Sequence, residues 1–365
     1  MVLPLAGLKV VAIEQAVAAP FASSRLADAG AEVIKIERPE GDFARGYDDV
    51  AAGQSSYFVW LNRGKTSVTL DLASPEGKAE LEALLGEADV LIQNLKRGAL
   101  ERLGFGTDRL GRDYPRLITC GISGYGDDGP MADRKAYDLL IQAESGLCSI
   151  TGGPSEPARV GLSIVDIATG ATAHAAILEA LIRRGITGEG AHISISMFDV
   201  MADWLTVPLL NHEGGKSPRR IGMAHPSIAP YGAFETRDGT LVLISVQSDR
   251  EWRKLCAEFL EDEGLGTDPR FATNVERVRN RAETDAIVGA AFAARDRDDA
   301  IAALLRADVA LAVVNDMAGL SAHPHLRRVT VETPNGPVSY PAPAAIFQDA
   351  PRAYGPVPAL NPRRP

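Results

Sequence analysis

Apolar strand-like segments alternate with helical segments through the first third of the chain. The apolar segments are residues 8–13, 31–36, 67–72, 89–93 and 117–122. Residues 20–29 have a proline at the start and a glycine just beyond the end, as short helices do. Ser74 and Pro75 begin another helix in a similar way. This alternation predicts an α/β fold with a mostly parallel sheet and ligands at the carboxyl ends of its strands.

The first strand-to-helix turn lacks the glycines of a dinucleotide-binding loop. A nicotinamide-binding fold has G-x-G-x-x-G at this place, because glycine lets the backbone approach a pyrophosphate. The turn here reads EQAVAAP at 14–20. The sequence therefore predicts a Rossmann-like topology but argues against a dehydrogenase.

Length, charge and cysteine spacing narrow the class of protein. A chain of 365 residues is long for one core and predicts two domains. The net charge of −10 argues against a nucleic-acid partner. The start lacks a signal-peptide pattern and no apolar run reaches membrane-spanning length, so we expect a cytoplasmic protein without a membrane partner. The cysteines are far apart, which indicates neither a disulfide framework nor a metal site.

A different pattern begins after residues 211–220, which are polar and contain glycine and proline, as linkers do. Residues 231–235 and 240–246 flank a turn that ends in Asp238 and Gly239, and this predicts a hairpin. Helical segments follow at 249–260 and 282–294. The second pattern therefore predicts a separate α+β domain.

One acidic residue, Asp166, lies in an apolar segment that reads VGLSIVDIATG at 160–170. A buried carboxylate must be paired or neutralised, because burial disfavours its charge. One interpretation is a helix N-cap, since a long helical pattern runs from Asp166 to about Arg184 and stops at Gly185. The other is a reactive carboxylate, with small residues behind it that let a ligand approach.

Basic residues gather beside the predicted strands of the first half. They are Arg38 after the second strand, Arg63 and Lys65 before the third, and Lys96, Arg97 and Arg102 after the fourth. In an acidic protein, such cations at one sheet edge suggest a polyanionic ligand. The alternative is that they are ordinary solvated surface charges.

Distinctive short blocks lie in order over most of the chain. They are GLKVV at 7–11, AP at 19–20, LADAGAEVIKIE at 26–37, LNRGKTS at 61–67, LDL at 70–72, GISGYGDDGP at 121–130, YD at 137–138, the Asp166 segment, HP at 225–226, APYG at 229–232 and DG at 238–239. Together these blocks resemble the family III coenzyme A (CoA) transferases, the CaiB/BaiF type, which includes formyl-CoA transferase and the carnitine-CoA transferases.

The resemblance implies covalent catalysis by Asp166. Its carboxylate would attack an acyl-CoA thioester to give a mixed anhydride, and the CoA thiolate would return to give an aspartyl-CoA thioester. An acceptor acid would then take the CoA by the reverse steps. Gln15 matches a family glutamine that stabilises the reacting groups. CoA and acyl-CoA would be substrates, with no permanently bound cofactor and no metal.

The resemblance also implies binding residues. Those expected at the CoA nucleotide and phosphates are Arg38, Asn94, Lys96 and Arg102, and those expected elsewhere along CoA are Lys135 and Tyr137. Asp138 and His225 are expected in the substrate pocket. Each has a plainer alternative: Asn94 as a turn residue, Tyr137 as a structural tyrosine, Asp138 as a backbone cap and His225 as a loop histidine.

Two other functions compete with a transferase. The α-methylacyl-CoA racemases of the same superfamily use a histidine just before an aspartate, where this chain has Tyr137 and Asp138. Tyrosine is a weak base at neutral pH, which disfavours racemisation. The second alternative is a CoA-binding protein without transfer activity, which Asp166 and Gln15 disfavour.

The resemblance implies an interlocked homodimer of two-domain chains. The large CoA-binding α/β domain is expected at 1–200 and 325–365, a linker at 201–223 and the small α+β domain at 224–324. For the acceptor we expect a carboxylic acid, favouring a C4 to C5 dicarboxylate. The residues that could pair its second carboxylate are Arg45, Tyr47, His225 and either Arg219 or Arg220.

Overall fold

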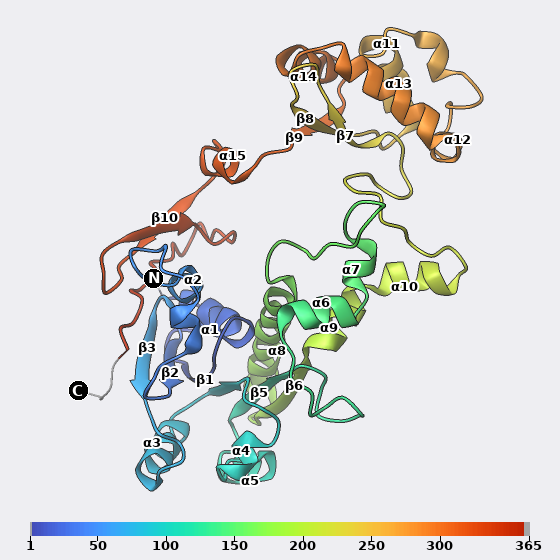
Figure 1. Cartoon of the computed structure of the whole chain (residues 1–365). Coiled ribbons are helices and arrows are strands. Elements are labelled where there is room, and N and C mark those ends of the chain that lie inside the picture. The colour runs from blue at the N-terminus through green and yellow to red at the C-terminus, as the bar shows by residue number, and fades with distance from the viewer. Residues whose placement is uncertain (1, 361–365) are drawn as a thin grey trace. The chain divides into compact units, whose positions relative to one another are not determined.

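The computed structural model describes residues 2–360, and these form two compact units (Figure 1). Of the described residues, the large unit contains 2–148, 159–210 and 327–360, and the small unit contains Ser149–Ala158 and Asn211–Leu326. The division differs from the expected boundaries. Residues 149–158, 211–223 and 325–326 belong to the small unit. Residues 201–210, expected in a linker, belong to the large unit and are helical except at Leu205.

Six parallel strands form the sheet of the large unit, in the order β3-β2-β1-β4-β5-β6. They are β1 (Lys9–Ile13), β2 (Glu32–Glu37), β3 (Lys65–Thr69), β4 (Val90–Gln93), β5 (Ile118–Ser123) and β6 (Ala191–Ser196). The parallel sheet predicted from the alternation is confirmed. The strand order reverses between β1 and β4, and a crevice for ligands is expected at the carboxyl ends of these two strands.

Helices cover both faces of this sheet (Figure 1). The helices of the large unit are α1 (Ala18–Asp28), α2 (Ser56–Asn62), α3 (Pro75–Leu85), α4 (Ala99–Arg102), α5 (Thr107–Asp113), α6 (Asp138–Glu144), α8 (Ile164–Thr187) and α9 (Met197–Trp204), with a 3₁₀ turn at Phe43–Gly46. Two further helices, α7 (Leu147–Ile150) and α10 (Thr206–Glu213), cross the boundaries between the units. Val10 and Ala12 of β1 belong to the core under α1 and α8, whereas Val11 and Ile13 belong to the core under α3 and α5. This alternation follows from the two-residue period of a strand.

Helix α8 is longer than the sequence predicted. Gly185, expected to end it, lies inside the helix, and the helix ends before Gly188, whose φ of 78° suits glycine. By length and composition alone α8 could cross a membrane, contrary to the expectation from the sequence. Its residues Ala168, Ala173 and Ile177 are fully buried in the core shared with α1 and the sheet. This packing is that of a core helix.

Gly170 sets how closely α8 approaches α1. A Cβ placed on Gly170 would lie 2.5 Å from the carbonyl oxygen of Ala18 and 2.8 Å from Cβ of Phe21. We expect Gly170→Ala to lower the free energy of unfolding by about 1–3 kcal/mol, because the two helices must move apart. Gly185→Ala is the control, since a Cβ there meets nothing within 4 Å. It should be neutral or stabilise the helix by up to about 1 kcal/mol. Equal urea denaturation midpoints for the two variants would contradict this prediction.

The small unit has a three-stranded antiparallel sheet and its own core. The strands β7 (Tyr231–Glu235), β8 (Leu241–Ser245) and β9 (Ala310–Val313) pair in that order, which confirms the predicted hairpin. The helices are α11 (Asp249–Glu258), α12 (Asn274–Arg279), α13 (Arg281–Ala293), α14 (Arg297–Arg306) and α15 (Met317–Ser321), with a 3₁₀ turn at Glu263–Gly266. The core is built on fully buried Trp252, Phe259, Phe271 and Phe292.

The C-terminal segment returns to the large unit. Strands β10 (Arg328–Val331) and β11 (Val338–Pro341) form a two-stranded antiparallel sheet. Val331 and Val357 pack on Phe58 and Val59 of α2. Gly64 also donates its N–H to the carbonyl oxygen of Pro356 at 2.8 Å. Residues near the C-terminus therefore complete a hydrophobic cluster to which α2 contributes the other buried side chains.

Candidate active site

Asp166 lies in the first turn of α8 and does not cap it. Helix α8 begins at Ile164, and the residue before it, Ser163, makes no side-chain capping bond. The cap comes from Asp138 instead. Its Oδ1 accepts hydrogen bonds from the N–H groups of Val165 at 2.8 Å and Asp166 at 3.2 Å. The expectation that Asp166 is the N-cap was therefore wrong, and the proposed capping role of Asp138 is found at the helix that carries Asp166.

The environment of Asp166 favours its protonated form. Burial, and after it the negative charge of Asp138, raises the pKa of Asp166 to about 7. The second oxygen of Asp138, Oδ2, accepts a hydrogen bond from Nε2 of Gln142 at 2.7 Å, which fixes the carboxylate beside the helix end. Asp166 is thus poised to gain or lose its proton near neutral pH, as functional carboxyl groups often are.

Asp138→Asn should shift the pH dependence of any reaction that needs ionised Asp166. The substitution keeps an oxygen for the helix cap and leaves Asp166 buried, but it removes the negative charge that, after burial, raises the pKa of Asp166. In the unmodified protein, kcat/KM should rise with pH around pH 7, and in the variant the rise should move to lower pH. Asp133→Asn is the control, since Asp133 lines the same pocket on an exposed site. A pH profile that Asp138→Asn leaves unmoved would contradict the assignment.

A cavity of about 540 Å³ surrounds Asp166. Several residues predicted from the sequence line it together: Gln15, Asn94, Lys96, Lys135, Tyr137, Asp138 and Asp166. Tyr47 and Arg159 also line this cavity, which we call the Asp166 pocket. Arg159 and the partly buried contact between the Ser163 and Tyr57 hydroxyls at 3.4 Å were missed from the sequence, because neither belongs to a recognisable motif.

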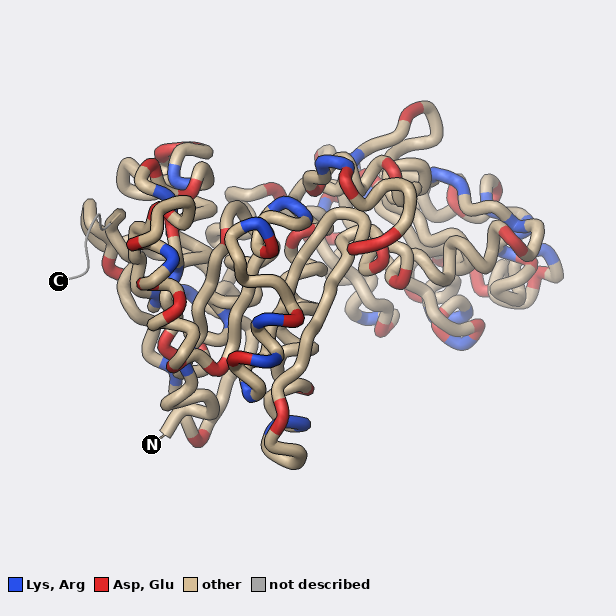
Figure 2. The backbone as a smooth tube through the Cα atoms, turned by 90° about the horizontal axis from the view of Figure 1, so that it is seen from below, with Lys and Arg blue, Asp and Glu red and all other residues tan. Residues whose placement is uncertain are grey.

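A second cavity, of about 660 Å³, lies beside the first at the carboxyl ends of β1, β2 and β4. Arg38, Lys96 and Arg102 line it, and we call it the Arg38 pocket. The two pockets share Gln15, Leu95 and Lys96. Acidic and basic residues are otherwise interspersed along the chain (Figure 2). A ligand with an anionic end could therefore reach from the Arg38 pocket to Asp166.

Two cations expected at the ligand are instead buried inside the protein. Lys65 donates to Oε1 of Glu14 at 2.6 Å, and both side chains are fully buried. The Arg63 guanidinium is paired with Asp28, with the Nε–Oδ1 distance at 2.8 Å. Arg63 lies just before β3 and Lys65 is its first residue, so both lie at the amino end of that strand, away from its carboxyl end. Including them in the ligand-binding cluster was wrong.

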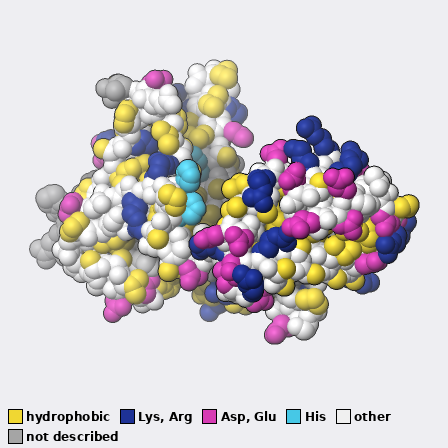
Figure 3. All heavy atoms as spheres, turned by 90° about the horizontal axis from the view of Figure 1, so that it is seen from above, with side chains coloured by type: hydrophobic (Ala, Val, Ile, Leu, Met, Phe, Trp, Pro, Cys, Tyr) yellow, Lys and Arg dark blue, Asp and Glu magenta, His cyan; other side chains and the backbone are white. Residues whose placement is uncertain are grey.

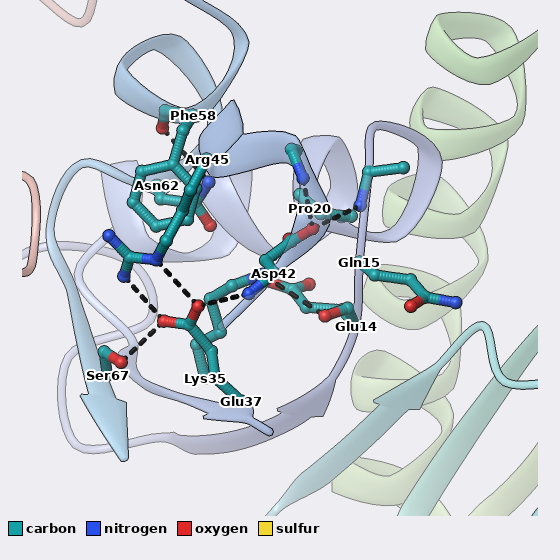
Figure 4. A network of polar contacts seen from close by, with 12 residues as sticks. Glu14, Gln15, Pro20, Lys35, Glu37, Asp42, Arg45, Phe58, Asn62 and Ser67 are labelled. Atoms are coloured by element: carbon teal, nitrogen blue, oxygen red, sulfur yellow. Dashed lines mark hydrogen bonds and ion pairs between the residues drawn. The ribbon is translucent and has the colours of Figure 1, made fainter. Parts of the chain in front are cut away.

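The Arg45 guanidinium is also already engaged by other groups of the protein. Its Nε and Nη2 donate to the two oxygens of Glu37 at 2.8 and 2.7 Å, and its guanidinium lies 3.7 Å from the Phe58 ring centroid (Figure 4). Burial alone would raise the pKa of Glu37, but the hydrogen bonds and nearby cations, Arg45 first, hold it at about 2. Arg45 therefore serves a structural ion pair and not an acceptor carboxylate.

His225 lies in the small unit, where its ring stacks on Tyr231 with centroids 5.1 Å apart. Its Nδ1 accepts a hydrogen bond from the N–H of Ser227 at 3.1 Å. Arg220, in the same unit, donates to the carbonyl oxygens of Gly153 and Ser149. The roles of His225 and of Arg219 or Arg220 in the substrate pocket stay predictions.

The side chains of residues 2–360 contain no cluster of three or more histidine, cysteine or acidic residues that could hold a metal ion. The two pockets of the candidate site are lined by carboxylates, amides and cations.

Comparison with known proteins identifies the family. The family model for CoA-transferase family III matches residues 5–363. The chain belongs to CoA-transferase family III. It is 37% identical over 349 residues to a succinate–glutarate CoA-transferase of Agrobacterium fabrum, covering 92% of this chain and 87% of that protein. It is 40% identical over 281 residues to an acetyl-CoA:oxalate CoA-transferase of Acetobacter aceti, covering 76% of this chain and 72% of that one.

The fold agrees with this family. The crystal structure of a CaiB/BaiF family protein from Brucella suis matches with a TM-score of 0.83 and 37% identity, covering 100% of this chain and 96% of that one. A structure of Rv3272 from Mycobacterium tuberculosis matches with a TM-score of 0.87 and 29% identity, covering 98% and 96%. The family III member described here is therefore a CoA-transferase that uses CoA thioesters as substrates.

Proposed function

We propose that this CoA-transferase works through covalent intermediates on Asp166. A carboxylate oxygen of Asp166 attacks the thioester carbon of the donor, the C–S bond breaks, and CoA leaves as a thiolate. The thiolate attacks the Asp166 carbonyl of the resulting anhydride, and the donor acid leaves as a carboxylate. The acceptor carboxylate attacks the aspartyl-CoA and releases the thiolate again. The thiolate then attacks the acceptor carbonyl, which gives the new acyl-CoA and frees Asp166.

The observation that supports this proposal is that the two pockets share the lining residues Gln15 and Lys96. CoA has a phosphorylated nucleotide at one end and a thiol at the other. Arg38, Lys96 and Arg102 line the Arg38 pocket and offer positive charges for the phosphates. Asp166 lines the adjoining pocket, where the thioester would lie. The Gln15 amide lines the same pocket and is a suitable donor for the charge that develops on the reacting carbonyl.

The decisive experiment is trapping of the intermediate. The protein is incubated with an acyl-CoA and hydroxylamine, digested, and analysed by mass spectrometry. Hydroxylamine cleaves an aspartyl thioester or anhydride and leaves a hydroxamate on the aspartate. A hydroxamate on Asp166 is expected, and none on Asp133 or Asp138. Exchange of the substrate α-hydrogen with solvent, with no adduct, would favour a racemase, and CoA binding without either would favour a CoA-binding protein.

For the acceptor we propose a small dicarboxylate. The relatives include CoA-transferases named for succinate and glutarate and for oxalate. In this chain Arg159 and Lys135 line the Asp166 pocket and could face a second carboxylate, with Tyr47 as a hydroxyl donor. Succinate should be a better acceptor than butyrate, which has the same chain length and one carboxylate. Equal kcat/KM values for the two acids would reject this choice of substrate.

We also propose a cytoplasmic homodimer, with interlocked chains as the family resemblance implies. Apolar side chains reach the surface of the molecule (Figure 3). Helix α10 buries none of its residues, and Val207 and Leu210 in it are 68% and 61% exposed. Exposed apolar surface of this kind marks a protein interface. Light scattering should give twice the chain mass, and interlocked chains should not exchange between dimers without unfolding.

A further inference from the structure

The turn that carries Gln15 is held from both sides by side chains of other elements. The amide of Asn94, just after β4, accepts from the N–H of Gln15 at 3.0 Å and donates to the carbonyl oxygen of Gln15 at 2.8 Å. Both polar ends of the Asn94 side chain are therefore engaged with the backbone of one residue. This pair of bonds spans the crevice between β1 and β4, where the strand order reverses.

The next residue, Ala16, has an unusual backbone conformation. Its φ of 62° lies in the left-handed region, which costs a residue with a Cβ free energy unless its surroundings hold it there. The N–H of Ala16 donates to Oδ1 of Asp42 at 3.2 Å. The other oxygen of Asp42, Oδ2, accepts from Nζ of Lys35 at 2.9 Å. Asn94 and Asp42 thus hold the strained turn, and Asp42 is itself held by Lys35.

A buried cluster of charges lies behind Asp42, and Figure 4 shows the part around Glu14, Lys35 and Asp42. The side chains of Lys35, Asp42 and Glu14 are all fully buried. Burial alone would lower the pKa of Lys35, but the carboxylates of Glu14 and Asp42 outweigh it and raise that pKa. The Lys35 ammonium therefore keeps its charge beside the two buried carboxylates. The side chain of Gln15 points away from it (Figure 4) and lines the Asp166 pocket.

We propose that Asn94 and Asp42 are positioning residues that hold the Gln15–Ala16 turn in its strained form and so aim the Gln15 amide into the Asp166 pocket. This proposal rests on the proposed function for the role of Gln15 in the reaction. It gives Asn94 a purpose different from the CoA contact that the family resemblance implies. It also explains why a non-glycine residue is kept in the left-handed region beside the candidate site.

A double-mutant cycle tests the role of Asn94. We expect Asn94→Ala to lower kcat about tenfold to 100-fold, because small misplacement of a catalytic group is costly. The KM for acyl-CoA and the Kd for CoA should change by less than about threefold, since the phosphate-binding cations are untouched. If Asn94 acts through Gln15, the double variant with Gln15→Ala should be no slower than Gln15→Ala alone, within about threefold. Gln93→Ala is the matched control, because the Gln93 amide oxygen serves the N–H of Leu95 and not Gln15.

The result that would overturn the proposal is a raised Kd for CoA in Asn94→Ala with kcat unchanged, which would make Asn94 a ligand contact. Fully additive losses in the double variant would also reject it. For Asp42, Asp42→Asn should lower kcat with the Kd for CoA unchanged, whereas Asp48→Asn, which alters a loop carboxylate bonded to Ser56, should not.

A crystal structure of Asn94→Ala supplies a readout that does not depend on activity. Ala16 should leave the left-handed region, and the Gln15 side chain should leave the Asp166 pocket. An unchanged turn would overturn the proposal even if the protein transfers CoA. If the unmodified protein transfers no CoA, the proposed function fails, and the position of Gln15 in this structure still decides whether Asn94 holds the turn.

Discussion

Asp166→Ala is expected to abolish CoA transfer while the protein still folds and still binds CoA. Covalent catalysis has no substitute for a missing nucleophile, and losses of more than about 10⁴-fold in kcat are typical of such variants. The cations expected to bind CoA, Arg38, Lys96 and Arg102, lie in the adjoining pocket and remain in place. Transfer is measured by chromatography of acyl-CoA products, and binding by calorimetry with CoA. Asp133→Ala, on the rim of the same pocket, should retain transfer.

The same carboxylate should also lower the stability of the fold, with a definite pH dependence. The pKa of Asp166 in the folded protein is about 7, because burial and then the charge of Asp138 raise it above its ordinary value of 3.8. The contribution of Asp166 to the free energy of unfolding therefore falls as the pH rises from about 4 to about 7, because the unfolded chain loses this proton first. Asp166→Asn should raise the free energy of unfolding at pH 8 by on the order of 2 kcal/mol, and by less at pH 4. A variant that is no more stable at pH 8 would contradict the buried setting of Asp166.

The second large effect is expected from Lys35, whose loss would leave buried carboxylates without a counter-charge. Its Nζ lies 2.9 Å from Oδ2 of Asp42 and 3.5 Å from Oε1 of Glu14, and all three side chains are 0% exposed. Lys35→Met should lower the free energy of unfolding by about 3–5 kcal/mol, because removing one partner leaves the other charges buried and only partly paired. Urea denaturation at pH 7 followed by circular dichroism measures the change.

An ion pair at the surface gives the control for Lys35. The Nζ of Lys9 lies 2.6 Å from Oε2 of Glu87, but the Glu87 side chain is 70% exposed. Lys9→Met should cost less than about 1 kcal/mol, because water solvates the remaining carboxylate. If the two substitutions destabilised the protein equally, the cluster around Lys35 could not be as buried as the structure has it.

The sequence predicted those features that depend on local pattern. The alternation of strand and helix patterns was sufficient to predict the parallel sheet. The turn that ends in Gly239 was sufficient to predict the hairpin of the small unit. The resemblance to family III CoA-transferases predicted Gln15, Asp138 and Asp166 as candidate site residues, and in the structure all three line one pocket. What failed was the assignment of partners that lie far away along the chain.

Arg63 and Lys65 illustrate why ion-pair partners that are distant along the chain could not be assigned from the sequence. Read along the sequence, they are cations beside a strand, and nothing local distinguishes them from Lys96. Their partners, Asp28 and Glu14, lie 35 and 51 positions away and become neighbours only when the sheet assembles. The cap that Asp138 provides for α8 spans 27 positions to Val165 for the same reason. Lys35 in the strand EVIKIE was the one local sign of the buried cluster, since a lysine among apolar strand residues must find a counter-charge.

The return of the C-terminal segment to the large unit has a consequence for synthesis of the protein. The small unit interrupts the large one, which resumes only at Arg327. Val331 and Val357 cover Phe58 and Val59, so these early residues stay uncovered while nearly 300 later ones leave the ribosome. The small unit, whose segment ends at Leu326, can bury its aromatic core before the large unit is complete. The domain that carries Asp166 therefore finishes folding last, although it contains the first residues made.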